Sequence, residues 1–128
     1  MKKGLAVAMA ALLGVATMGT TAMAAASGDI TICSREDGSG TRGAFIELFG
    51  IEEKDADGNK VDNTTEAAKI TNSTSVMLST VAQDVNAIGY VSLGSLDDSV
   101  TAVKIDGAEA TAESIESGDY KVVRPFNI

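Results

Sequence analysis

The chain has 128 residues, enough for one domain, and a net charge of −8. This acidity disfavours nucleic acid and anionic lipid as partners. The chain has no histidine and a single cysteine, Cys33, which excludes a Ser-His-Asp or Cys-His catalytic set and an internal disulfide. We expect Cys33 to be a small buried residue, and we expect neither a metal nor a cofactor.

The first 24 residues have the pattern of a secretory signal peptide. A basic start, Met1-Lys2-Lys3, precedes an uncharged run over residues 4–17, and Ala22-Met23-Ala24 fits a cleavage site. We therefore predict a signal peptide at 1–24, one domain at 25–128, and export to the periplasm, the cell surface or the medium. No cysteine stands at the cleavage site, so a lipid anchor is not expected. The alternative, an uncleaved membrane anchor, would need a longer apolar run, and as a leader the segment should pack poorly against the domain.

The most informative stretch lies between a predicted strand at 29–33 and a predicted helix at 42–49. A glycine-rich turn joins them, and the first N–H groups of a helix have no intrahelical acceptor. With the helix dipole they attract an anion, and an arginine at the strand end would add two parallel donors. The residues of this predicted oxyanion pocket are Arg35, Ser39, Gly40 and Thr41, with Asp37 expected to hold Arg35 in an ion pair. The alternative is a plain turn in which Ser39 is only the helix cap.

The remaining elements alternate between strand and helix, which predicts a layered α/β domain. Residues 52–60 are expected to form a surface loop; Asp55-x-Asp57-x-Asn59 resembles a calcium loop, but Lys60 replaces its required glycine. A helix should start near Asn72 or Ser73. The core face of that helix is expected to carry Val76, Met77, Thr80, Val81 and Val85.

The last third of the chain should be strand-rich. A buried strand is expected at 87–91, where Gly89 indicates a close backbone approach. A short helical turn at 92–96 and a strand at 100–105 should follow. Thr111 should cap a short helix at 112–116 that ends at Gly118, and residues 120–128 should be extended, leaving an edge open to a partner.

Three stretches together resemble the phosphate-binding proteins of ABC phosphate transporters. They are residues 34–41 (SREDGSGT) with Phe45, residues 87–91 (AIGYV) and residues 118–125 (GDYKVVRP). Their order and spacing match the second half of that family. The resemblance implies a type II periplasmic-binding-protein fold, of which this chain would be a single lobe with a mixed central sheet flanked by helices.

The same resemblance implies a function and partners. In the family the second lobe contributes an arginine and a Ser-Gly-Thr motif to bound phosphate, which correspond to Arg35, Ser39, Gly40 and Thr41, while Asp37 corresponds to an aspartate that pairs with the arginine. The expected ligand is inorganic phosphate, held without enzymatic activity and, in a lone open lobe, at millimolar affinity, about −4 kcal/mol. The expected partners are a separate first lobe or a second copy, and an ABC permease if transport is retained. The alternatives are a phosphate-sensing or protein-interaction module and a truncated or split binding protein.

Overall fold

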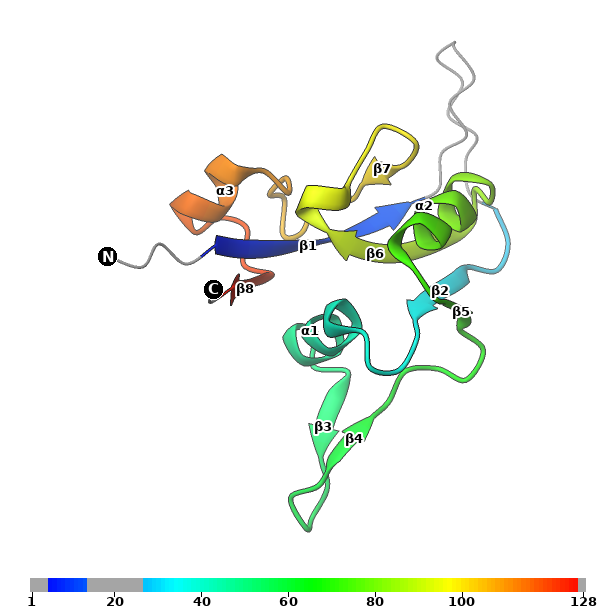
Figure 1. The fold of residues 1–128 in the computed structure, drawn as a ribbon, viewed down its shortest axis with the longest axis vertical. Coiled ribbons are helices and arrows are strands. Elements are labelled where there is room, and N and C mark those ends of the chain that lie inside the picture. Colours follow the sequence, from blue (N-terminus) through cyan, green and yellow to red (C-terminus); the bar gives the residue numbers. More distant parts are fainter. Residues whose placement is uncertain (1–4, 14–26, 127–128) are drawn as a thin grey trace.

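The computed structural model describes residues 5–13 and 27–126. Its main sheet has the strand order β5-β2-β6-β1-β7, with β8 paired to β1 (Figure 1). The strands of this sheet are β1 (Leu5–Leu13), β2 (Thr31–Arg35), β5 (Lys69–Thr71), β6 (Ala87–Ser92), β7 (Thr101–Ala102) and β8 (Val123–Phe126). β2 runs parallel to β5 and β6, whereas β1 runs antiparallel to its three neighbours, so the sheet is mixed.

Two helices cover opposite faces of the parallel part of this sheet. Side chains alternate between faces along a strand. Cys33 and Val91 therefore share one face, where they form a core with Met77 and Val81 of α2 (Thr74–Ala82). Tyr90 lies on the other face, in a second core that includes Ala44 of α1 (Gly40–Leu48), Tyr120 and Val122. The α/β fold predicted from the sequence is confirmed.

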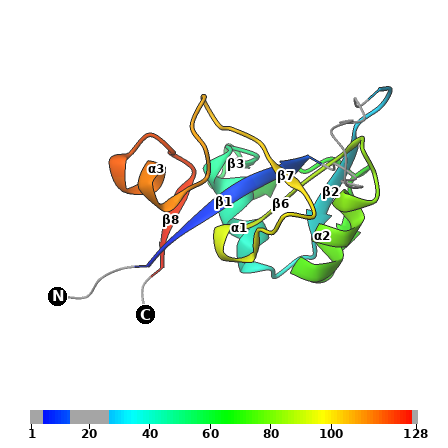
Figure 2. The ribbon, with the colours of Figure 1, turned by 90° about the horizontal axis from the view of Figure 1, so that it is seen from above.

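The two ends of the sheet carry different elements. Figures 1 and 2 both show β8 and α3 (Ala112–Ser117) beside the first residues of β1, far from β2 and β5. A separate hairpin, β3 (Glu52–Lys54) and β4 (Lys60–Asp62), extends from the end of α1. Among the described residues no helix is long and apolar enough to cross a membrane.

Several local predictions are confirmed. Cys33 is buried, Ser73 caps α2, and Thr111 caps α3, which ends at Gly118 with a φ of 82°. A Cβ placed on Gly89 would lie 2.5 Å from Met77 Sδ, which is the close approach expected there. Helix α1 begins at Gly40, two residues earlier than predicted.

Other predictions need correction. The expected loop at 52–60 contains the hairpin β3–β4, because Asp55 accepts the N–H groups of Asp57 and Asn59 and so closes a tight turn between short charged strands. Strand β5 was not predicted, and the strand expected at 100–105 is reduced to β7. The short helical turn expected at 92–96 is confirmed, as a 3-10 helix at Leu93–Ser95. Val76 is 41% exposed, so it does not belong to the core face of α2.

The first residues differ from expectation in their packing. The segment expected to pack poorly as a leader forms β1, which lies in the sheet between β6 and β7. Cleavage after Ala24 stays a prediction, and the cleavage motif lies outside the described residues. Residues 127 and 128 of the predicted extended end also lie outside them.

Candidate anion-binding site at the carboxyl edge of the sheet

Two parallel strands end side by side, and each leads into a helix. Arg35, the last residue of β2, is in register with Thr71, the last residue of β5. Helix α1 starts at Gly40 and helix α2 at Thr74, so two helix N-termini follow the same edge of the sheet. In open α/β sheets this carboxyl edge is where ligands commonly bind.

The N-terminus of α1 offers free backbone donors. The Oγ of Ser39 accepts the N–H of Arg42 at 3.3 Å, and the carbonyl of Ser39 accepts the N–H of Gly43 at 3.0 Å. The N–H groups of Gly40 and Thr41 have no acceptor within the described part of the chain. Gly40 is exposed and Thr41 is half-buried, so an anion from solvent can reach these donors.

The turn before α1 is shaped by Gly38. Its φ of 85° is a left-handed conformation that side chains disfavour. The turn is closed by the N–H of Ser39, which donates to the carbonyl of Glu36 at 3.2 Å. Ser39 is therefore a helix cap, as the alternative interpretation held, and the cap leaves the next two N–H groups open to a ligand.

The guanidinium of Arg35 lies at the same edge and already donates three hydrogen bonds, to two residues. Its Nε and Nη2 donate to Glu36 at 2.8 and 3.0 Å, and its Nη1 donates to Thr74 Oγ1 at 3.3 Å. These hydrogen bonds to Glu36 raise the pKa of Arg35 and lower that of Glu36. The Arg35 side chain is 12% exposed whereas that of Glu36 is 36% exposed, so the carboxylate is the partner that solvent and a ligand reach more easily.

The ion pair predicted between Arg35 and Asp37 is corrected by the structure. Asp37 contacts Arg42 at 3.2 Å and its side chain is 96% exposed. Glu36, the immediate neighbour of Arg35, provides the carboxylate instead, because it lies close enough for a two-pronged contact.

Arg42 fixes the first turn of α1 on the strand end. Its Nη1 donates to the carbonyl of Arg35 at 2.9 Å, and its Nη2 donates to Asp62 Oδ2 at 2.7 Å. The pKa of Arg42 is raised, chiefly by the hydrogen bond to Asp62. The pKa of Asp62 is lowered, first by the Thr64 hydroxyl and then, among further causes, by Arg42. Arg42 is thus a structural clamp rather than a free cation for a ligand.

A buried hydroxyl network holds the end of β2. The hydroxyl of Tyr90 accepts the N–H of Arg35 at 3.1 Å and lies 3.0 Å from Ser34 Oγ. The hydroxyl of Thr71 donates to the carbonyl of Ser34 at 3.2 Å, and the carbonyl of Thr71 accepts the N–H of Glu36 at 3.0 Å. These bonds set the direction in which Arg35 leaves the sheet.

Sequence reasoning missed three contributors to the site. Thr74 follows the predicted helix start at Asn72 or Ser73 and was given no role, Arg42 was only the first residue of the predicted helix at 42–49, and Glu36 was passed over in favour of Asp37 as the partner of Arg35. Thr74 could be placed at this edge only once β5 is known, because β5 brings the second capped helix beside the end of β2. Within the described residues no group of three acidic, cysteine or histidine side chains is placed to hold a metal.

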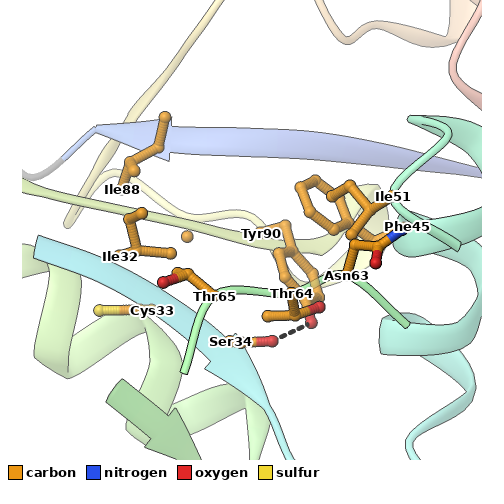
Figure 3. Close-up of a pocket in the computed structure, with 11 residues that line it drawn as sticks. Ile32, Cys33, Ser34, Phe45, Ile51, Asn63, Thr64, Thr65, Ile88 and Tyr90 are labelled. Atoms are coloured by element: carbon orange, nitrogen blue, oxygen red, sulfur yellow. Dashed lines mark hydrogen bonds between the residues drawn. The ribbon is translucent and has the colours of Figure 1, made fainter. Parts of the chain in front are cut away.

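An apolar cavity of about 250 Å³ lies beside α1, between the sheet and the loop at 63–65, and differs from this edge in its apolar lining (Figure 3). Ile32, Ile88 and Tyr90 of the sheet line it together with Phe45 and Ile51, and Asn63 and the threonines that follow close one side. The dashed line in Figure 3 marks the Ser34–Tyr90 hydrogen bond at its border. Its lining suits apolar groups and not a phosphate ion.

Comparison with known proteins finds similarity to phosphate-binding proteins, both in sequence and in structure. No protein-family model matches the chain. The chain is 55% identical over 134 residues to "Phosphate-binding protein PstS 2" of Streptococcus agalactiae, a match that covers 100% of this chain and 46% of the relative. The chain thus spans about half the length of the curated relatives it matches.

The fold of this chain is also similar to solved structures of phosphate transport proteins. An ABC-type phosphate transport receptor from Vibrio cholerae has a TM-score of 0.80 and 26% identity, over 94% of this chain and 55% of that one. A putative phosphate ABC transporter substrate-binding protein with bound phosphate, from Clostridium perfringens, has a TM-score of 0.71 and 32% identity, over 96% of this chain and 56% of that one.

Proposed function

Because this chain belongs to the PstS family of phosphate-binding proteins, of whose members it spans about half, we propose that it is a phosphate-binding lobe. Proteins of this family are ABC transporter substrate-binding proteins, which are extracytoplasmic and non-enzymatic. The proposed ligand site consists of Arg35, Ser39, Gly40 and Thr41. The single observation that carries the proposal is that the N–H groups of Gly40 and Thr41 have no acceptor among the described residues, at the edge where Arg35 ends β2.

The proposed binding mode follows from charge and hydrogen bonding. Phosphate oxygens would accept the N–H groups of Gly40 and Thr41 and the hydroxyl of Thr41, where the helix dipole adds roughly half a positive charge. The guanidinium of Arg35 would turn from Glu36 to the phosphate, replacing one anion by another. The half-site is open to water, which weakens each of these bonds. We therefore expect a dissociation constant in the millimolar range, about −4 kcal/mol.

Calorimetric titration of the full chain with phosphate tests this proposal. Arg35→Ala should weaken binding about tenfold or more, since a hydrogen bond to a charged group contributes roughly 1.5–3 kcal/mol. Arg124→Ala is the matched control, because it removes the same charge from an exposed position on β8, at the far end of the sheet. Absence of heat at millimolar phosphate, or equal weakening by both variants, would contradict the proposal.

One observation favours a protein partner in addition. Ile30, directly before β2, Ile32 of β2 and Ile70 of β5 are 66%, 42% and 54% exposed, and such an apolar surface is typical of an interface. We propose that a first lobe or a second copy covers it, and that an ABC permease is engaged only by the two-lobed assembly. Sedimentation of the full chain should then show a dimer, or a complex with a supplied first lobe, that Ile70→Lys abolishes. A chain that stays monomeric in both experiments would contradict this proposal.

The exported location belongs to the same proposal. The leader pattern at 1–24 supports secretion of the lobe, and the absence of a cysteine at the cleavage site supports a protein without a lipid anchor. Detection of the 25–128 product outside the cytoplasm tests both statements, and a product retained in the cytoplasm would contradict them.

A further inference from the structure

Strand β1 holds the outer part of the sheet together. Its residues 9–13 lie antiparallel to residues 88–92 of β6, and its residues 5–8 lie antiparallel to Val123–Phe126 of β8. Its last two residues also face β7. Among the described strands, β7 and β8 pair with β1 alone (Figures 1 and 2), while Val100, just before β7, and Val122, just before β8, pack in the cores on the faces of β6.

The second half of β6 depends on β1 as well. The parallel ladder between β2 and β6 covers Ala87 and Ile88, whereas the ladder with β1 continues to Ser92. Tyr90 and Val91 lie in this half and are only 2% and 1% exposed. Buried N–H and C=O groups require hydrogen-bond partners, so this part of β6 needs a strand beside it.

The strand that meets this need is also the apolar part of the predicted leader. Leu5–Leu13 contains no charge, no glycine and no proline, which suits both a leader and a buried strand. Cleavage after Ala24 would therefore remove an interior strand. At 94% of this chain, the match to the Vibrio cholerae receptor extends beyond what residues 27–128 can supply, so part of the segment before residue 27 has a counterpart in that fold.

We propose that the place of β1 in the sheet, between β6 and the pair β7 and β8, is a strand-accepting site. Leu5–Leu13 fills it before processing, and an extended, uncharged strand of another polypeptide fills it afterwards, antiparallel to β6. The partner is recognised by main-chain hydrogen bonds along residues 88–92, with small and aliphatic side chains that match those of β1. This inference rests on the leader cleavage proposed above but not on phosphate binding, so its test uses no phosphate.

The test begins with the full chain. A specific protease site is placed directly after Ala24, the folded chain is cut, and the product is passed over a size-exclusion column under native conditions. We expect residues 1–24 to stay with the lobe. A labelled nine-residue peptide with the sequence of β1 and a terminal lysine tag should then replace them, with one peptide bound per lobe. At a peptide concentration of 100 times the dissociation constant, mass action should raise the ratio of folded to unfolded lobe by about 100-fold.

Two peptide variants make the test specific. Ala11 lies opposite Tyr90, and Ala11→Pro removes an N–H from the strand and should weaken uptake at least about tenfold. Ala11→Val is the matched control and should bind as well as the parent, because valine favours extended structure. Equal uptake of the proline and valine peptides would overturn the proposal. Loss of residues 1–24 on cutting, with amide exchange at residues 88–92 as slow as in the uncut chain, would overturn it too.

Discussion

Tyr90→Phe probes the network that aims Arg35 at the candidate site. Phenylalanine keeps the ring, which stacks on Phe45 with centroids 3.9 Å apart, and removes only the hydroxyl. That hydroxyl accepts the N–H of Arg35 at 3.1 Å and lies 3.0 Å from the Oγ of Ser34. Ser34 is 2% exposed, so water cannot replace the lost partner there.

The size of the effect follows from these contacts. Removing one partner of a buried hydrogen bond costs about 1–3 kcal/mol, because the remaining group has been taken out of water. The Arg35 N–H is only partly buried and regains some solvation. We therefore expect Tyr90→Phe to lower the free energy of unfolding by about 2 kcal/mol, and to weaken phosphate binding because Arg35 is less well fixed.

Urea denaturation of Tyr90→Phe, Ser34→Ala and the double variant measures this effect. The two single changes break the same hydrogen bond, so the double variant should lose less stability than the two single losses added together, by at least about 0.5 kcal/mol. Additivity within about 0.3 kcal/mol would refute the shared network. So would a loss below about 0.5 kcal/mol for Tyr90→Phe, the usual range of a surface substitution.

Three further predictions concern packing, ligand competition and pH. Gly89→Ala should lower the free energy of unfolding by about 1–3 kcal/mol, since the new Cβ would lie 2.5 Å from Met77 Sδ. Gly94→Ala is the control and should have little effect, because no atom lies within 4 Å of its Cβ position. Equal losses of stability for the two variants in urea denaturation would contradict this. Glu36→Gln should tighten phosphate binding in calorimetry by removing the anion that occupies the guanidinium at the end of β2, and weaker binding would contradict it. Asp62 has a lowered pKa in the folded chain. Its stabilising contribution is therefore present above the pKa of the same carboxyl in the unfolded chain, about 4, and is lost as the pH falls through the folded-state pKa. Asp62→Asn should flatten the loss of stability below about pH 4, and an unchanged slope would contradict this.

The fold was predictable where a short stretch of sequence has a pattern typical of one kind of element. The apolar run at 87–91 became β6, and the capping residues Ser73 and Thr111 each start a helix. The turn at residues 36–39 was predictable as a helix start with free donors, because the helix N-terminus requires it. These features depend on neighbours within a few residues, which the sequence displays directly.

The remaining features depend on contacts between distant residues. β5 has only three residues and is defined by its pairing with β2, so no local pattern marks it. The carboxylate partner of Arg35 was chosen as Asp37, but side-chain direction at the turn gives that place to Glu36. β1 was not predicted for a related reason: an uncharged apolar run is typical both of a leader and of an interior strand, so the run alone does not distinguish them.

The central claim is that the start of α1 binds phosphate through its backbone. The most direct measurement is a phosphate titration of the ¹⁵N-labelled full chain at constant ionic strength, followed by NMR, with chloride as the control. If phosphate binds there, the Gly40 and Thr41 amide signals and the Arg35 guanidinium signal should show saturable shifts with millimolar midpoints. Shifts confined to exposed lysines, or the same shifts with chloride, would contradict it.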